Sequence, residues 1–243
     1  MNDILSVSDL SKSFGAVTVA DEQTFNVAQG EALGIIGPNG AGKTSLFNLI
    51  TGTLAPNSGT ITYCGKNITK HPAAKRCKNG IARSFQVPQP FSGMTVFENA
   101  LVAATQSADL RGQAAYDLCL EVLEQTELLP KANVKAGQLT LLDRKRLELT
   151  RALCTRPKLL LLDEIAGGLT ENECQSLIET IKSIHADGVT VIWIEHVVHA
   201  LLAVVDRLIV IDFGRIVANG DPTDTMNSDQ VREIYLGIDA DVE

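Results

Sequence analysis

The segment Gly37-Pro38-Asn39-Gly40-Ala41-Gly42-Lys43-Thr44 matches the phosphate-binding pattern G-x-x-x-x-G-K-[ST] at every fixed position. The apolar run 32–36 before it indicates a buried strand, and 45–50 after it indicates a helix. The loop is therefore expected between a strand and a helix, which is the context that gives the pattern its physical meaning. The sequence predicts a site for a nucleoside triphosphate.

The residue types of this loop explain how a triphosphate is held. Glycines allow backbone angles that are closed to other residues, so successive N–H groups at the start of a helix can point at phosphate oxygens. Lys43 supplies a cation for the outer phosphates, and Thr44 offers a hydroxyl to Mg²⁺. A glycine-rich turn that matches by chance is the alternative, and the flanking strand and helix disfavour it. The expected nucleotide contacts in this loop are Gly37, Pro38, Asn39, Gly40, Ala41, Gly42, Lys43, Thr44 and Ser45.

Two carboxylates follow a second buried strand. The run Leu159–Leu162 is continuously apolar and leads directly into Asp163 and Glu164. In open parallel sheets, ligands gather at the carboxyl ends of the strands. In phosphate-loop nucleotidases an aspartate at this place helps to hold magnesium, and a neighbouring base orients the attacking water. We expect Asp163 in the first role and Glu164 in the second; a solvated acidic strand end is the alternative.

Composition sets limits on the class of protein. The chain has 243 residues, of which 45% are hydrophobic, and this suits one large α/β domain or a domain with an insertion. A formal charge of −8 argues against a general nucleic-acid surface. The five cysteines form no C-x-x-C pair, which favours reduced thiols in the cytosol. With neither a basic leader nor an apolar run of membrane length, we expect no transmembrane segment.

The order of the patterns indicates a single domain over 1–243. Strand-like segments around the phosphate loop make the first third β-rich, and helical spacing then dominates over an insertion at about 88–157. Strand runs return after the insertion and alternate with helices, which is typical of a parallel core sheet. The tail 221–243 is expected to form two short helices.

Further motifs in the expected order make the chain resemble the ATPase subunit of ABC transporters over nearly its full length. The family's glutamine loop matches Gln86, its switch histidine matches His196, and its adenine-stacking aromatic residue matches Phe14. Each residue alone has an ordinary alternative, respectively a loop amide, a surface imidazole and a core ring. The resemblance implies an α/β P-loop ABC ATPase fold with a β-rich N-terminal subdomain, a parallel core sheet and an inserted helical subdomain. It also implies ATP and Mg²⁺ as cofactors, with catalytic residues Glu164, His196 and Gln86 and metal contacts Thr44, Gln86 and Asp163.

The sequence departs from the family at its signature, which is close to Leu-Ser-Gly-Gly-Gln and closes over the nucleotide of a second subunit. The matching residues here are Leu139, Thr140, Leu141, Leu142 and Asp143. Close backbone approach favours glycine, so we expect Leu142 to obstruct the partner's phosphate and Asp143 to repel it. Thr140 keeps a hydroxyl there. Ile165 replaces a usual proline, and Thr170 replaces a common aspartate.

The tail 231–237 and the segments 97–100 and 194–196 resemble ATPases of branched-chain (hydrophobic) amino-acid uptake systems. The resemblance implies an ATP hydrolase that powers an ABC importer for such amino acids or related small organic solutes. The alternatives are an ATPase of a lipid or lipopolysaccharide export system and a soluble non-transport ABC ATPase. Implied partners are a second ATPase subunit, in a heterodimer or a homodimer, integral membrane permease subunits and a solute-binding protein, with no nucleic acid. The implied location is peripheral, on the cytoplasmic face of the inner (plasma) membrane.

Overall fold

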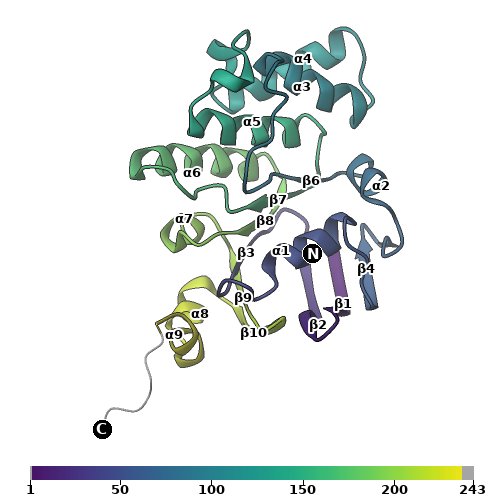
Figure 1. Ribbon diagram of the computed structural model, residues 1–243, viewed down its shortest axis with the longest axis vertical. Helices are drawn as coiled ribbons and strands as arrows, with labels where there is room; N and C mark the ends of the chain where they lie inside the picture. The colour runs from purple at the N-terminus through teal and green to yellow at the C-terminus, as the bar shows by residue number, and fades with distance from the viewer. Residues whose placement is uncertain (1, 237–243) are drawn as a thin grey trace.

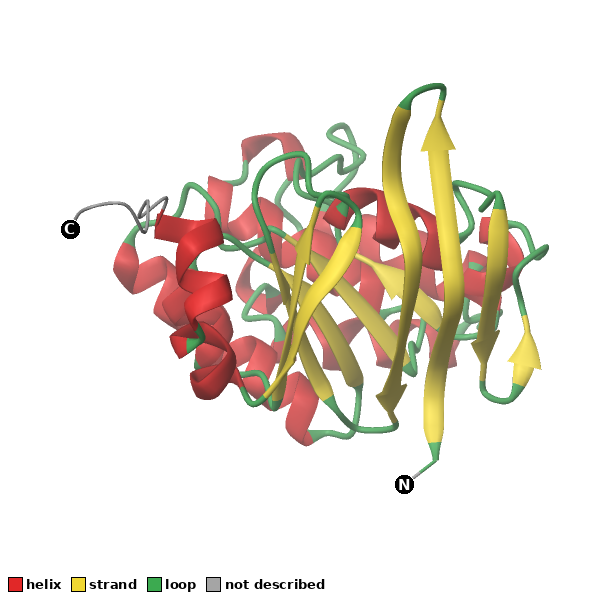
Figure 2. Cartoon of the chain, turned by 90° about the horizontal axis from the view of Figure 1, so that it is seen from below, coloured by secondary structure: helices red, strands yellow, loops and turns green. Residues whose placement is uncertain are grey.

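Two sheets and the helices around them make up the fold in the computed structural model, which describes residues 2–236 (Figure 1). The first sheet has the order β2-β1-β4-β5 and is antiparallel. Its strands are β1 (Asp3–Phe14), β2 (Val17–Ala28), β4 (Ser58–Tyr63) and β5 (Lys66–Asn67). Figure 2 shows the long β1–β2 hairpin standing beside the strands of the second sheet. The β-rich first third predicted from the sequence is this sheet.

The second sheet has the order β10-β9-β3-β8-β7-β6. Its members are β3 (Ala32–Ile36), β6 (Ile81–Arg83), β7 (Leu159–Asp163), β8 (Thr190–Ile194), β9 (Arg207–Asp212) and β10 (Arg215–Gly220). All neighbouring pairs are parallel except β9 and β10. The predicted parallel core sheet is thus confirmed, with an antiparallel edge strand that the sequence did not indicate.

Alternate residues of the central strands serve two separate cores. Leu159 and Leu161 of β7 pack into the core shared with the first sheet, whereas Leu160 and Leu162 pack into the core under the helices. Every residue of β3, β7 and β8 is buried. A strand covered on both faces needs apolar residues at all positions, which explains the uninterrupted runs in the sequence.

Helical elements fill the chain between β6 and β7 and lie together at one end of the molecule (Figure 1). They are α3 (Val96–Gln106), α4 (Gln113–Gln125), the 3₁₀ turns η1 (Leu129–Lys131) and η2 (Ala136–Gln138), and α5 (Leu141–Leu153). Helix α3 begins after Thr95, whose hydroxyl accepts from Glu98 N while the Glu98 carboxylate accepts from Thr95 N. This reciprocal cap fixes the start of the helix at Val96.

The remaining helices connect or cover the strands. They are α1 (Lys43–Thr51), α2 (Ala73–Lys78), α6 (Glu171–Ala186), α7 (Val198–Leu202), α8 (Pro222–Asn227) and α9 (Asp229–Leu236). The predicted tail 221–243 contains α8 and α9, and its part 237–243 lies outside the described residues. Among the described helices there is none with the length and apolar character needed to cross a membrane.

Candidate functional site

The phosphate-binding loop joins the end of β3 to α1 and lines a cavity of about 450 Å³. Gly42 stands at the N-cap of α1 with φ 104°, and a Cβ added there would lie 2.1 Å from the Val19 carbonyl oxygen. A Cβ on Gly37 would lie 2.0 Å from the Ile211 carbonyl oxygen. Glycine is therefore required at both positions, by backbone angle and by the closeness of neighbouring strands. The cavity is lined by Val17, Val19, 39–45, Gln86 and Glu164.

Lys43 lies folded back on its own loop. Its ammonium group donates to the carbonyl oxygens of Gly37 at 2.6 Å and Pro38 at 2.9 Å, and only 5% of the residue is exposed. Burial lowers the pKa of Lys43, and the charges of Glu164 and Asp163 oppose that shift. The site thus holds a desolvated cation between two carboxylates and a helix N-terminus, an arrangement suited to a polyanion.

Asp163 ends β7 and is buried beside Arg83, which ends the neighbouring β6. Arg83 Nη2 donates to Asp163 Oδ2 at 2.5 Å, and Arg83 Nη1 donates to Asn48 Oδ1 at 2.6 Å. Asp163 Oδ1 is buried, and within residues 2–236 it has no hydrogen-bond partner. A buried carboxylate oxygen without a partner is costly unless something binds it, and Mg²⁺ prefers oxygen ligands. This unpaired oxygen and the nearby Thr44 of the loop fit a magnesium site.

Glu164, Gln86 and His196 are brought together from three different places in the chain. His196 Nε2 lies 2.6 Å from Glu164 Oε1, and Gln86 Nε2 donates to Glu164 Oε2 at 2.5 Å. Glu164 and His196 follow the ends of the adjacent parallel strands β7 and β8, while Gln86 follows β6. Glu164 has φ 48°, an uncommon angle for a residue with a side chain. Gln86 and His196 thus converge on the carboxylate of Glu164, and Gln86 and Glu164 line the cavity.

Phe14 lies apart from the lining of this cavity. It ends β1, is 53% exposed, and its ring centre is 5.1 Å from Lys12 Nζ. Val17 and Val19, across the turn, are the apolar residues that line the cavity near the loop. Stacking of Phe14 on a base stays a prediction, and the two valines are further apolar contacts that the sequence did not single out.

The segment 139–143 forms the capped start of α5. Thr140 is the N-cap, and its hydroxyl accepts from Asp143 N at 3.3 Å. Asp143 Oδ2 accepts from Thr140 Oγ1 at 2.8 Å and from Lys131 Nζ at 2.5 Å. Asp143 is buried and ion-paired, so the expectation that it repels a partner's phosphate does not match its position. Its side chain completes the cap and is turned toward Lys131.

The two leucines of the same segment also differ in position. Leu141 is 46% exposed, whereas Leu142 packs partly against the helical core. Leu141 is therefore the more exposed of the two at the tip of α5, and obstruction of a partner's phosphate by Leu142 stays a prediction. Thr170 caps α6 with Glu173 in the same reciprocal way as Thr95 and Glu98.

Several polar residues at the site were missed by reasoning from sequence. Arg83 bonds to Asp163, which is 80 residues away in the chain, and to Asn48, which is 35 residues away. Buried Glu195 stands next to His196, and buried Lys145 lies on α5 with its Nζ 3.5 Å from the Glu164 carbonyl oxygen. One feature of the sequence could have indicated Glu195: it is a charged residue directly after the apolar run Val191–Ile194.

Comparison with known proteins places this geometry in context. A profile described as ABC transporter matches residues 20–167. The chain is 35% identical to the high-affinity branched-chain amino acid transport ATP-binding protein LivG of Salmonella typhimurium, over 96% of this chain and 98% of the relative. It is 34% identical to BraF of Pseudomonas aeruginosa, which carries the same description, with the same coverage. It is 31% identical to the lipopolysaccharide export system ATP-binding protein LptB of Haemophilus influenzae, over 96% and 97%.

Solved structures show the same fold. A nucleotide-free ATP-binding cassette from an ABC transporter superposes with a TM-score of 0.89 at 30% identity, covering 96% of this chain and 99% of that one. A second cassette, in its ADP conformation, also gives 0.89 at 31% identity, covering 98% and 100%. The similarity therefore extends over both sheets and the helical region between β6 and β7.

Proposed function

Because this chain belongs to the ABC transporter family as one of its ATP-hydrolysing cassettes, we propose that it powers the uptake of branched-chain amino acids or related small organic solutes. The observation that carries the proposal is the similarity to LivG and BraF over 96% of the chain. The chain is an ATPase subunit of a transporter; the transported solute and the direction are the proposal.

The nucleotide site works through residues of this chain in the following way. The triphosphate lies against 37–45, and Lys43 exchanges the carbonyl oxygens of Gly37 and Pro38 for oxygens of the outer phosphates. Glu164 accepts a proton from the attacking water as general base. His196 contacts the γ-phosphate and, through its 2.6 Å contact, keeps the Glu164 carboxylate in place. Gln86 holds the second oxygen of that carboxylate.

Magnesium would be held by Thr44, Asp163 Oδ1 and Gln86, and when bound it neutralises charge on the phosphates. Arg83 has a separate task. Its ion pair with Asp163 Oδ2 fixes the carboxylate so that the other oxygen, Oδ1, stays available. Removing Arg83 is therefore expected to loosen the metal site without removing any of its ligands.

A transport experiment separates uptake from export. The chain would be reconstituted in lipid vesicles with its permease subunits and solute-binding protein. We expect leucine, isoleucine or valine with the binding protein to stimulate ATP hydrolysis and to accumulate on the side of the membrane that carries the ATPase. Stimulation by a lipid or lipopolysaccharide, with no response to amino acids, would instead support the export function suggested by the similarity to LptB.

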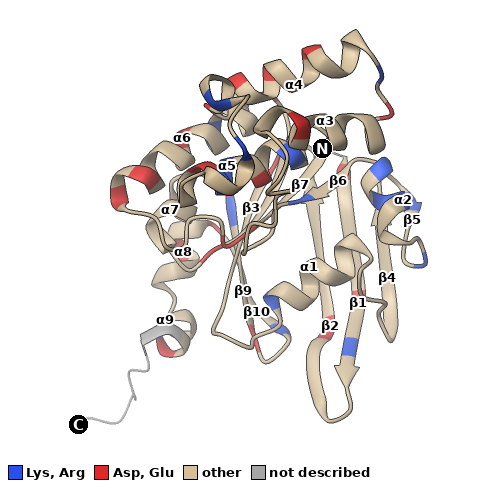
Figure 3. Ribbon diagram, turned by 45° about the horizontal axis from the view of Figure 1, so that its top comes forward, with Lys and Arg blue, Asp and Glu red and all other residues tan. Residues whose placement is uncertain are grey.

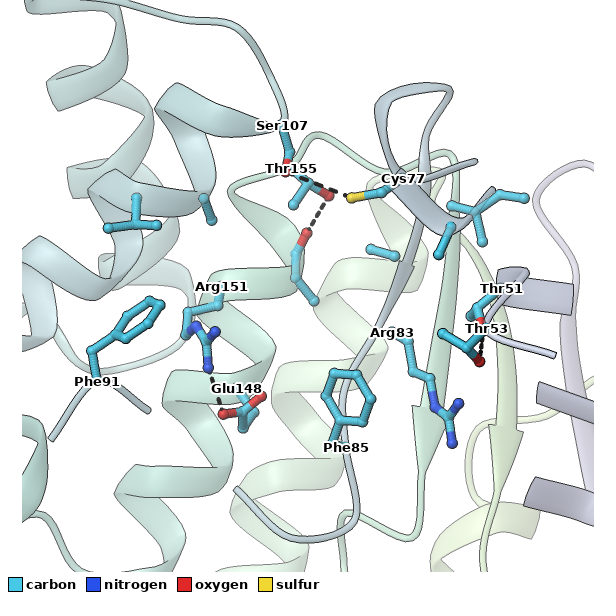
Figure 4. Close-up of a pocket in the computed structure, with 16 residues that line it drawn as sticks. Thr51, Thr53, Cys77, Arg83, Phe85, Phe91, Ser107, Glu148, Arg151 and Thr155 are labelled. Carbon is cyan, nitrogen blue, oxygen red and sulfur yellow. Dashed lines mark hydrogen bonds and ion pairs between the residues drawn. The ribbon is translucent and has the colours of Figure 1, made fainter. Parts of the chain in front are cut away.

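Attachment to the permease is proposed at a groove between the second sheet and the helical region. The groove has a volume of about 280 Å³, and Figure 4 shows Phe91 beside Arg151 and Phe85 beside Arg83, with Glu148 between the two phenylalanines. Phe85 and Phe91 line it and are exposed. These apolar residues and the charged ones between them suit a short amphipathic helix. Helix α2, beside the groove, carries a cluster of basic residues (Figure 3).

Crosslinking tests this attachment and, with it, the peripheral location at the cytoplasmic face of the membrane. Phe91→Cys would be made after Cys64 and Cys77 are changed to Ser, because Cys64 is exposed and Cys77 lines the groove. We expect crosslinks from position 91 to the permease. Leu120→Cys, on the similarly exposed surface of α4, is the control and should give none. Crosslinks from position 91 only within this chain would indicate a hinge instead of a docking groove.

A further inference from the structure

Glu195 is a fully buried carboxylate that bonds to two separate loops at the catalytic edge of the sheet. Its Oε2 accepts from Ala166 N at 2.9 Å, and its Oε1 accepts from His196 N at 3.1 Å. The indole Nε1 of Trp193 donates to Oε2 at 3.3 Å. Ala166 lies two residues after Glu164, and His196 follows Glu195 directly. One side chain therefore ties together the backbone segments that carry the proposed base and the proposed γ-phosphate contact.

A buried lysine of α5 lies close to this carboxylate and to Glu164. Lys145 is buried on that helix, and its Nζ lies 3.5 Å from the carbonyl oxygen of Glu164. Burial lowers the pKa of Lys145, and the charges of Glu195 and Glu164 oppose that shift. Lys145 thus belongs to the same buried charge group as the two glutamates. Because Lys145 is on the helix that begins at Thr140, this group also connects α5 to the catalytic loops.

We propose that Glu195 is a positioning residue that sets the distance between Glu164 and His196 by holding the 164–166 and 194–197 segments together. The inference rests on the proposed roles of Glu164 and His196. It adds a buried residue that does not line the nucleotide cavity and acts through the backbone.

Energetic considerations favour this role over an incidental one. Burial raises the pKa of Glu195, while hydrogen bonds from Ala166, His196, Val197 and Trp193 oppose the shift. A buried carboxylate is costly unless its oxygens are well bonded. The hydrogen bonds that offset the burial of Glu195 come from both catalytic segments. They therefore fix the spacing between these segments. Near-attack geometry depends on such spacing, since a displacement of about 1 Å can lower a rate by roughly 10²-fold.

Glu195→Gln is the informative substitution because it keeps size and shape. Two oxygens now accept backbone N–H groups, but a glutamine has only one oxygen, so its NH₂ group must face either Ala166 N or His196 N. The variant therefore loses either the Ala166 bond, which crosses between the two segments, or the His196 bond, which shapes the segment of residue 195 itself. In the full-length chain within the assembled transporter, we expect kcat for ATP to fall about 10- to 100-fold. The Kd for a fluorescent ATP analogue should stay within about threefold of the parent, because the phosphate-binding loop is not bonded to Glu195.

The control is Glu31→Gln. Glu31 also accepts a backbone N–H, from Ala28 at 2.7 Å, and pairs with Arg207 at 2.6 Å, but it lies at the opposite end of β3 from the phosphate-binding loop. We expect Glu31→Gln to lower the melting temperature without changing kcat. If the activity lost in Glu195→Gln is no more than its loss of folded protein accounts for, the proposal is overturned.

Glu164→Gln distinguishes the two ways in which the inference can fail. If Glu164→Gln abolishes hydrolysis while Glu195→Gln turns over like the parent, the positioning role is wrong and the proposed base stands. If neither variant slows hydrolysis, the assignment of the base is wrong and the positioning role is overturned with it. Should Glu195→Gln not fold, Glu195→Asp decides by the same criteria, because it keeps the charge but is one methylene too short to bond to both segments.

Discussion

His196 Nε2 lies 2.6 Å from Glu164 Oε1, and the other oxygen of the same carboxylate accepts from Gln86 at 2.5 Å. Glu164 is thereby held from two sides by side chains that follow two other strands of the sheet. The orientation of the proposed base therefore depends on the relative positions of the ends of β6, β7 and β8. Substitution of the base and of its neighbours should therefore have different consequences.

Glu164→Gln should bind ATP normally and hydrolyse it very slowly. The amide keeps the shape of the side chain but cannot accept a proton, and general base catalysis typically contributes about 10²–10⁴ in rate. Steady-state turnover and nucleotide titration measure the two effects. Glu171→Gln, an exposed acid at the start of α6, should behave like the parent. Turnover near the parental value in Glu164→Gln would rule out this residue as the principal base.

His196→Ala should slow hydrolysis and leave nucleotide affinity less affected. The substitution removes the contact that orients Glu164 and the proposed contact with the γ-phosphate, but it leaves the phosphate-binding loop intact. His199→Ala is the matched control, because His199 is exposed on α7 three residues later. Equal effects of the two histidine variants on kcat would contradict a specific role for His196.

Lys43→Ala should weaken ATP binding. A hydrogen bond to a charged group is worth about 1.5–3 kcal/mol, which corresponds to roughly 10- to 100-fold in Kd. The measurement is a titration with a fluorescent ATP analogue, and Lys66→Ala on the distant strand β5 controls for the loss of one positive charge. Unchanged affinity in Lys43→Ala would remove the phosphate-binding loop from the proposed site.

The unusual segment 139–143 should make the two sites of an assembled dimer unequal, if the partner is a different ATPase with an intact signature. Leu141 is exposed at the tip of α5, where a partner's phosphate would approach the helix. Loss of one donor aimed at a developing anion typically costs about 10²–10³ in rate. Glu164→Gln in this chain should then abolish most hydrolysis, whereas the equivalent change in the partner should spare most of it. Equal losses would show that Thr140 and the N-terminus of α5 are sufficient.

Acid should weaken the caps of α3 and α6. Hydrogen bonds from the backbone and side chain of Thr95 lower the pKa of Glu98 below its ordinary value of 4.5, and Thr170 does the same for Glu173. Each folded-state pKa lies below the unfolded one, so the stabilisation is present above pH 4.5 and is lost as pH falls through the folded-state pKa. Urea unfolding should be measured from pH 7 to about pH 3.5. Over this range the free energy of unfolding should fall less in the double variant Glu98→Ala/Glu173→Ala than in the parent. Glu121→Ala, an exposed acid of α4, should keep the parental pH dependence.

The sequence by itself determined the features whose cause is local. The phosphate-binding loop needs glycine at 37 and 42 because of backbone geometry. Both glycines are fixed positions of the sequence motif, so the motif predicts the loop. Strands β3, β7 and β8 were recognisable because a strand buried on both faces must be apolar throughout. Glu164, Gln86 and His196 were expected to meet because they match one family pattern. Short β6 and the antiparallel β10 carry too little pattern to be recognised.

Only the tertiary structure decided how the polar groups pair. Arg83 pairs with Asp163 because β6 and β7 are neighbours in the sheet. The residues of the two segments do not predict that these strands are adjacent. Asp143 turns toward Lys131, and Leu141 rather than Leu142 is exposed, because helix capping and core packing set the rotation of α5. Glu195 joins two loops for the same reason. Pairings of this kind depend on which distant residues share a strand edge or a helix face, and that is settled only when the whole core packs.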